Sequence, residues 1–344
     1  MTVPLVRVHG DPFERGYRHG AARAAALHAF LDDDLCRLNR ILPAPTTMAS
    51  LRPLISDYQE KIEDATPALA EEIRGLAQGA GIDPEQALLL QLRREIMGYQ
   101  RIPTMGDCTT YASAGASPVL AQTVDLNGDL DDQICVLDTG QALVLSFGGL
   151  LGYLGVNRHG LAIGLNLVLG GEWRPGLPPY LAIRHLLDTA TGMDEALEIL
   201  HGLRLASSRS LTLCDPVKAT HVEILGDDVR VAATTEVIHT NHFLHPDFVP
   251  HDELNVFARN SSVQRLETCR KGLAAMTPDA DVAEHFELLS TKPIRVTDTG
   301  DIRRERTVAA VVMLPGAGEL HVRRGDPAGA STHTFRSGRE RIDA

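Results

Sequence analysis

The distribution of hydrophobic and polar residues divides this 344-residue chain into two parts. From about residue 12 to residue 97 the pattern predicts helices, beginning with an Ala- and Leu-rich run over 13–42 that a Pro-Ala-Pro sequence ends. Thr66 and Asp83 each precede a proline, so each is expected to cap a helix that has proline at its first position. Gln86 stands where it can complete a capping box with Asp83.

After Gly106 the pattern changes to short strands. Helices and strands then come in separate runs, which predicts an α+β protein with mostly antiparallel sheets and helices packed outside them. The expected strands cover residues 109–114, 119–124, 134–138, 142–147, 153–157, 161–167, 211–214, 221–225, 229–233, 237–239, 308–313 and 320–323. The expected later helices cover residues 180–190, 194–203, 262–275 and 279–289.

Composition excludes several classes of protein. The net charge of −12 argues against a nucleic-acid surface, because phosphate binding needs clustered Lys and Arg. The most apolar stretch, 142–156, contains four glycines and is too short for a transmembrane helix, so no membrane partner is expected. The N-terminus lacks the pattern of a signal peptide. Five widely spaced cysteines without a Cys-x-x-Cys pair favour a reducing, cytoplasmic setting over a disulfide framework.

Candidate chemistry begins where the two parts meet. A polar loop containing Pro and Gly runs straight into Cys108 at the head of a strand, although a lone cysteine is more often a buried apolar residue. An antiparallel hairpin would return Asp125 towards Cys108, and Asn166 and Asn241 also stand at strand ends. A thiol nucleophile needs a base, oxyanion donors and a group that orients it, and Asn amides are suitable donors.

Together these residues belong to a longer series of motifs. In chain order the motifs are Gly10-Asp-Pro-Phe-Glu-Arg-Gly-Tyr-Arg-His-Gly20, Asp107-Cys-Thr-Thr, Gln122-Thr-Val-Asp125, Gly155-Val-Asn-Arg-His-Gly-Leu-Ala-Ile-Gly-Leu-Asn166, Ser207-Ser-Arg-Ser, His239-Thr-Asn-His-Phe243, Asn260-Ser-Ser-Val-Gln-Arg265, Thr307-Val-Ala-Ala-Val-Val-Met313 and Leu320-His-Val-Arg-Arg-Gly-Asp-Pro327. With these motifs the chain resembles, over most of its length, the isopenicillin N acyltransferase family, a relative of the choloylglycine hydrolases and penicillin V acylases.

The resemblance implies a four-layer αββα sandwich with an N-terminal nucleophile. It also implies a precursor that cleaves itself before Cys108, giving a smaller helical subunit, 1–107, and a larger catalytic subunit, 108–344, which stay together as one compact unit. The penicillin enzyme has Gly before the nucleophile, where this chain has Asp107. The freed α-amino group, with a pKa near ~8, would act as the base for the thiol, so no second base is needed.

The resemblance also implies roles for individual residues. Asp125 would contact the new amino group, Asn241 would be an oxyanion donor, and Asn166 would bind the substrate amide or the oxyanion. Arg265 matches a position of positive charge near the nucleophile, which favours the thiolate. Gln122 stands where the bile-salt branch has Arg and is a candidate substrate neighbour.

The expected substrate is a small-molecule amide or an acyl thioester, and no organic cofactor is expected. The segment 170–180 contains Trp173, the only Trp, and Tyr180; it is a candidate wall of the acyl pocket, or a rigid surface loop. Two other functions stay open at this point. One is a metal-dependent hydrolase that uses the histidines between His239 and His251; the other is a non-catalytic binding protein that keeps the fold.

Overall fold

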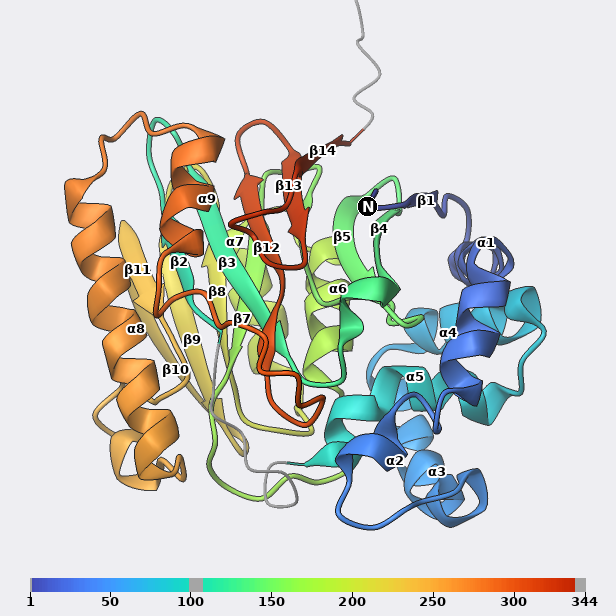
Figure 1. Cartoon of the computed structure of the whole chain (residues 1–344). Helices are drawn as coiled ribbons and strands as arrows, with labels where there is room; N and C mark the ends of the chain where they lie inside the picture. Colours follow the sequence, from blue (N-terminus) through green and yellow to red (C-terminus); the bar gives the residue numbers. More distant parts are fainter. Residues whose placement is uncertain (1, 99–107, 338–344) are drawn as a thin grey trace, which may run out of the picture.

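The computed structural model describes residues 2–98 and 108–337 (Figure 1). The predicted N-terminal helical region is confirmed, and Asp83 and Gln86 form the expected capping box. Thr66 precedes its helix as predicted, but its hydroxyl donates to the carbonyl of Ile62 at 3.2 Å instead of capping the helix that follows. The helices are α1 (Pro12–Asp32), α2 (Leu38–Ile41), α3 (Met48–Ala65), α4 (Pro67–Ala80) and α5 (Pro84–Met97).

Helices α1 and α4 pack at very short range through glycines. A Cβ atom on Gly16 would lie 1.9 Å from the carbonyl oxygen of Glu72, and one on Gly20 would lie 2.3 Å from that of Leu76. Only glycine permits such a backbone approach. The N-terminal motif of the sequence therefore holds the helical region together.

The strands form two sheets in the described part of the chain. The eight-stranded sheet has the order β1-β4-β5-β6-β7-β8-β9-β10, and the six-stranded sheet has the order β11-β2-β3-β12-β13-β14. The first contains β1 (Leu5–Arg7), β4 (Ile134–Asp138), β5 (Ala142–Phe147), β6 (Leu154–Asn157), β7 (Ala162–Leu167), β8 (Arg209–Cys214), β9 (Ala219–Leu225) and β10 (Asp228–Thr234). The second contains β11 (Glu236–His239), β2 (Thr110–Ser113), β3 (Val119–Leu126), β12 (Arg306–Leu314), β13 (Glu319–Arg324) and β14 (Thr332–Arg336).

The two sheets face each other with helices on both outer sides, which is the predicted αββα order of layers (Figure 1). Strands β2, β3 and β12 contact β8, β7 and β6 across the interface. Helices α8 (Val256–Ala275) and α9 (Val282–Ser290) cover the six-stranded sheet, and α6 (Pro179–Thr189) covers the eight-stranded one and packs against α7 (Met193–His201). The core between the layers is built from the inward side chains of both sheets.

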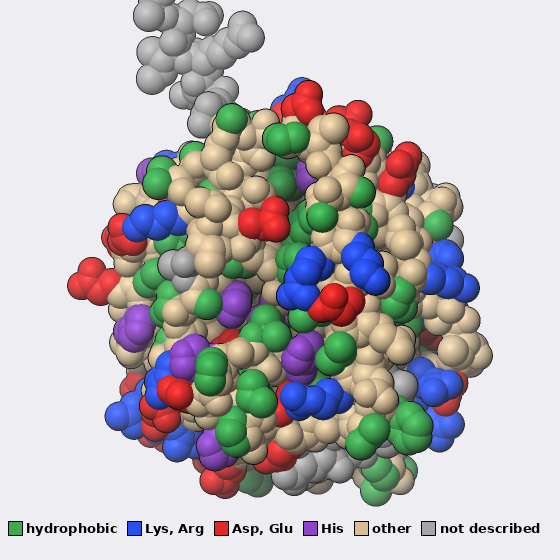
Figure 2. Space-filling view, turned by 90° about the vertical axis from the view of Figure 1, so that its left-hand side faces the viewer, with side chains coloured by type: hydrophobic (Ala, Val, Ile, Leu, Met, Phe, Trp, Pro, Cys, Tyr) green, Lys and Arg blue, Asp and Glu red, His purple; other side chains and the backbone are tan. Residues whose placement is uncertain are grey.

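The pairing is antiparallel as predicted, except that β1 joins β4 in parallel. Strands β1 and β14 were not predicted, and α8 begins at Val256, six residues before the expected start. Seen from the side of α8 and α9, acidic and basic side chains are interspersed among apolar ones (Figure 2). In the described ranges, every helix is too short or too polar to cross a bilayer.

Candidate active site

Cys108 lies at the head of β2, next to the end of β3, as the predicted hairpin requires. Thr110 is opposite Gln122 in the β2–β3 ladder, which brings Cys108 beside Asp125. The Asp125 backbone N–H lies 3.5 Å from the Cys108 sulfur, and the thiol lies 3.7 Å from the Asp125 carbonyl oxygen. The sulfur is buried, with Cys108 only 5% exposed, and it lies on the wall of a cavity.

The Asp125 side chain is buried and carries a carboxyl group that lines the same cavity. Its Oδ2 accepts a hydrogen bond from the Thr123 hydroxyl at 2.9 Å, whereas Oδ1 has no hydrogen-bond partner among the described residues. Burial raises the pKa of Asp125 to about 7, against the opposing effects of the Thr307 and Thr123 hydroxyls and the Arg265 charge. This carboxyl group therefore changes its charge near neutral pH.

Two side chains hold the backbone carbonyl of Cys108. Asn166 donates from Nδ2 at 2.9 Å and Arg265 donates from Nη1 at 2.8 Å. Arg265, from α8, also donates from Nη2 to Asn241 Oδ1 at 2.8 Å. The arginine therefore connects the nucleophile to Asn241, and both Arg265 and Asn166 act on Cys108 through its backbone.

Asn241 follows β11 and lines the cavity that contains Cys108. Its Nδ2 donates to the carbonyl of Leu167 at 2.9 Å, and its backbone N–H donates to the Ser262 hydroxyl at 2.8 Å. An amide nitrogen carries two hydrogens, so one N–H remains for another acceptor after the bond to Leu167. Asn241 is thus an oriented donor on the wall of the cavity that also contains the thiol.

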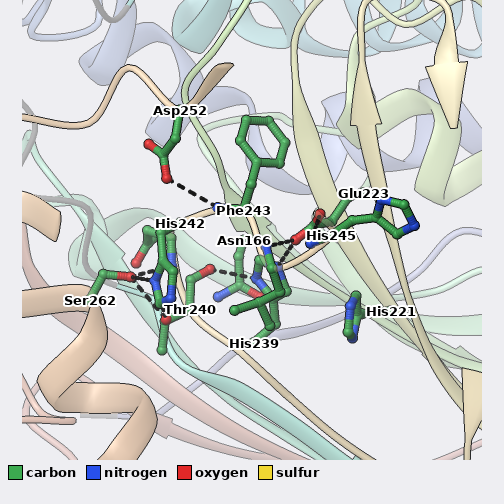
Figure 3. A network of polar contacts seen from close by, with 12 residues as sticks. Asn166, His221, Glu223, His239, Thr240, His242, Phe243, His245, Asp252 and Ser262 are labelled. Atoms are coloured by element: carbon green, nitrogen blue, oxygen red, sulfur yellow. Dashed lines mark hydrogen bonds and ion pairs between the residues drawn. The ribbon is translucent and has the colours of Figure 1, made fainter. Parts of the chain in front are cut away.

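The histidines around Asn241 form a hydrogen-bond network (Figure 3). The Nδ1 of His239 lies 2.7 Å from the carbonyl oxygen of Thr240, and its Nε2 lies 2.8 Å from Glu223 Oε1. His239 and the backbone N–H groups of Leu244 and His245 lower the pKa of Glu223, although its burial acts in the opposite direction.

His242 completes this network through the Ser262 hydroxyl, at 2.7 Å from its Nδ1. The imidazoles of His239 and His242 are thus engaged in hydrogen bonds that fix the segment carrying Asn241. Within residues 2–98 and 108–337, no three His, Cys, Asp or Glu side chains are placed to share a metal ion. The arrangement therefore gives no support to the metal-dependent hydrolase.

The cavity wall includes a tyrosine that sequence reasoning missed. Tyr153 stacks on Tyr180 at a ring-centroid distance of 5.3 Å. Burial, with the Cys108 thiol among the groups that act in the same direction, raises the pKa of Tyr153 well above its usual value. Its only sequence signal is an aromatic residue just before a strand.

The cavity that contains the Cys108 thiol is lined by residues from both parts of the chain. The lining residues are Phe30, Leu90, Gln91, Arg93, Arg94, Met97, Cys108, Asp125, Leu126, Asn127, Leu130, Phe147, Gly148, Leu150, Tyr153, Leu165, Leu167, Tyr180, Arg209, Asn241 and Glu305.

The three predicted substrate neighbours lie in different places. Tyr180 lines the cavity. Gln122 does not, because its amide exchanges two hydrogen bonds with the backbone of Leu165, at 2.8 and 2.9 Å, and ties the two sheets together. Trp173 lies behind the cavity wall, with the guanidinium of Arg209 over its ring at 4.9 Å. Asp107, on the other side of the expected cleavage point, lies outside the described residues.

We expect Trp173→Ala to weaken substrate binding through Arg209. The ring of Trp173 supports a guanidinium that lines the cavity, and a cation–π contact contributes about 0.5–2 kcal/mol, so KM should rise roughly 2- to 30-fold with a smaller change in kcat. Steady-state kinetics measure this, with Trp173→Phe as the control that keeps an aromatic ring. Unchanged KM and kcat in Trp173→Ala would remove the residue from substrate binding.

Comparison with known proteins identifies the family of the chain. Residues 113–328 match the model of a family of acyltransferases described as acyl-coenzyme A:6-aminopenicillanic acid acyl-transferase. The match covers more than half of the chain, so the chain belongs to this family, and the resemblance predicted from its motifs is confirmed.

Individual relatives are more distant. The 40 kDa form of acyl-coenzyme A:6-aminopenicillanic-acid-acyltransferase from Emericella nidulans is 26% identical over 249 residues, which cover 70% of this chain and 69% of that protein. Among solved structures, a Caenorhabditis elegans orthologue of N-acylethanolamine-hydrolyzing acid amidase has a TM-score of 0.46 at 18% identity, covering 61% of this chain and 93% of that one. Penicillin V acylase from Agrobacterium tumefaciens has a TM-score of 0.42 at 11% identity, covering 67% and 86%.

Proposed function

We propose that the chain is a self-processing cysteine enzyme with an N-terminal nucleophile, either an amidohydrolase or an acyltransferase. It would take an acyl group from a small N-acyl amide or acyl thioester, hold it as a thioester on Cys108, and pass it to water or to an amine. The observation that carries this proposal is the position of Cys108. Its thiol lies on a cavity wall, its carbonyl is held by Asn166 and Arg265, and the backbone of Asp125, whose carboxyl group lines the same cavity, lies beside the thiol.

Self-processing would begin with attack of the Cys108 thiol on the carbonyl carbon of Asp107. The C–N bond breaks, the thiol proton goes to the departing nitrogen, and a thioester joins Asp107 to the Cys108 sulfur. Water then hydrolyses the thioester, which restores the thiol and leaves a free α-amino group on Cys108. Asp125 Oδ1 has no partner among the described residues, so it is available to accept a hydrogen bond from this amino group.

The two fragments would remain associated after cleavage. β1 of the first fragment forms a ladder with β4 of the second, from Leu5 opposite Val136 to Arg7 opposite Asp138. A fully buried ion pair between Glu72 and Arg184, at 2.8 Å, also joins them. Dissociation would have to break both the strand ladder and this buried contact.

In turnover the α-amino group would take the thiol proton while the sulfur attacks the substrate carbonyl. Asn241 would donate its remaining amide N–H to the oxyanion, and the contact with Arg265 fixes the orientation of that amide. Tyr153 keeps its proton at neutral pH, so its hydroxyl can donate to the thiolate. Water or an amine would then release the acyl group.

Mass spectrometry of the acylated protein tests the function. We expect purified protein, exposed briefly to a panel of N-acyl amides and acyl thioesters, to carry one acyl group on the peptide that begins at Cys108. Hydroxylamine should remove it, because it cleaves thioesters. A thiol-reactive probe that fails to label Cys108 in the folded protein, together with the absence of any acyl adduct, would favour the non-catalytic binding protein instead.

A further inference from the structure

Arg93 is a buried cation on the wall of the same cavity. It lies on α5, is 8% exposed, and donates from Nε to the carbonyl of Cys36 at 2.8 Å. Its Nη2 has no hydrogen-bond partner among the described residues. Burial lowers the pKa of its guanidinium to about 10, and the nearby charges of Arg94 and Arg37 act in the same direction. The group remains a cation at neutral pH.

Two other buried arginines, Arg184 and Arg209, have an acidic partner, and the buried Arg265 is held by hydrogen bonds to the carbonyl of Cys108 and to Asn241. Arg184 forms an ion pair with Glu72 at 2.8 Å, and Arg209 forms one with Glu95 at 3.5 Å. No carboxylate of the described residues forms an ion pair with Arg93. None is among the groups that shift the pKa of its guanidinium. A buried cation without a counter-ion is unfavourable, which points to a partner that comes from outside the chain.

A second donor without a partner lies next to it. Asn127 is 3% exposed, lines the cavity, and its Nδ2 has no hydrogen-bond partner among the described residues. The next residue, Gly128, has φ +91, and a Cβ atom there would lie 2.4 Å from Arg93 Nη2. The guanidinium therefore packs against the backbone beside Asn127, in a space that only glycine leaves open.

This pair of donors lies close to the reaction centre. Asn127 is two residues beyond Asp125, so the two Cα atoms are at most about 7 Å apart. Leu126 and Leu130 contribute apolar wall next to this pair, and the acidic side chains of Asp125 and Glu305 also line the cavity. Such a cavity suits a short aliphatic chain with an acceptor at its end, because charge-assisted hydrogen bonds to a buried guanidinium are strong.

We infer that Arg93 and Asn127 bind a carboxylate of the substrate, a few bonds away from the carbonyl that Cys108 attacks. The inference rests on the proposed function, since it assigns the substrate class of that site. The carboxylate can belong to the acyl part or to the amine part of the substrate, and two pairs of probes distinguish these sources. Glutaryl and pentanoyl p-nitroanilide differ in the acyl part, and N-pentanoylglycine and N-pentanoylglycinamide differ in the amine part.

We expect kcat/KM of the wild-type protein to be about 10- to 100-fold higher for the charged member of one pair. Arg93→Met should reduce this ratio to near one. Arg18→Met, at an exposed position on α1, is the matched control and should keep the wild-type ratio. A wild-type ratio near one for both pairs, or a ratio that survives Arg93→Met, would overturn the inference.

A second variant, Asn127→Asp, tests the inference even if Arg93→Met does not fold. It places a carboxylate of the protein next to the Arg93 cation. We expect this variant to have a higher Tm than the wild type and to lose the preference for charged probes. An unchanged Tm together with an unchanged preference contradicts the inference.

A binding measurement separates this inference from the proposed function. Free glutarate should bind to the Cys108→Ala protein in calorimetry, at least 10-fold more tightly than to the Cys108→Ala/Arg93→Met protein. If acyl thioesters form on Cys108 but glutarate does not bind, the inference fails and the proposed function stands. If glutarate binds through Arg93 but no thioester forms, the carboxylate site stands and the proposed function fails.

Discussion

Cys108→Ala is expected to leave the protein as one chain of 37.3 kDa and to abolish turnover. The wild-type protein should instead give two bands on a denaturing gel, which correspond to residues 1–107 and 108–344. Both effects have one cause, since the same sulfur would attack Asp107 during processing and the substrate during turnover. Removing the nucleophile of a covalent mechanism lowers kcat by roughly 10⁶-fold.

The other cysteines provide the control for this experiment. Burial raises the pKa of Cys269 to about 12, so its thiol is protonated at neutral pH and is a poor nucleophile. Cys269→Ala should therefore still give two bands and keep turnover, although the cavity left behind will lower its stability. N-terminal sequencing of the larger band should begin at Cys108. Active wild-type enzyme that retains the bond between residues 107 and 108 is incompatible with the proposed mechanism.

The fold was predictable where its pattern is local. The hairpin that carries Cys108 and Asp125 consists of two apolar segments joined by a short turn, so its pairing follows from the sequence. The strand β1 could not be predicted, because three residues give no period and its partner β4 is far away in the chain. The start of α8 was missed because Val256 and Phe257 are apolar yet exposed, which breaks the expected pattern of the helix.

The site was predictable only where a motif marks it. Five predicted residues come together around the carbonyl and the thiol of Cys108, although they belong to strands and a helix far apart in the sequence. They are Cys108, Asp125, Asn166, Asn241 and Arg265. Their catalytic roles remain proposals.

Residues without a motif were missed or misjudged. Arg93 was missed, because an arginine in a helix is usually exposed, whereas α5 is buried on nearly all sides. Gln122 binds the backbone of Leu165 and not the substrate cavity, because a sequence does not show whether a buried side-chain amide will bind a backbone or a substrate.

Asp125→Asn is expected to lower kcat roughly 10³- to 10⁴-fold, as removal of an orienting carboxylate does in related mechanisms. The amide keeps the shape of the side chain but cannot hold the positive charge of the new α-amino group. The ionised form of Asp125 is required in the wild-type enzyme. The positive α-amino group of the cleaved enzyme lowers the pKa of this carboxyl from about 7 in the uncleaved chain, so activity should rise with increasing pH in a range below 7. The variant should lack this limb of the pH profile. Asp138→Asn, on β4, is the control and should keep both the activity and this limb of the pH profile.

The same carboxyl group makes the stability of the uncleaved chain depend on pH. Its pKa is 3.8 in the reference state and about 7 in the folded protein because of burial, so between these values the unfolded chain has lost the proton that the folded chain keeps. Stability contributed by the protonated group is therefore complete below pH 3.8 and is lost as the pH rises to about 7. The uncleaved Cys108→Ala protein provides the test. The change in Tm caused by adding Asp125→Asn to it should be more favourable at pH 8 than at pH 4. An equal effect at both values would show that Asp125 does not titrate as the buried group described above.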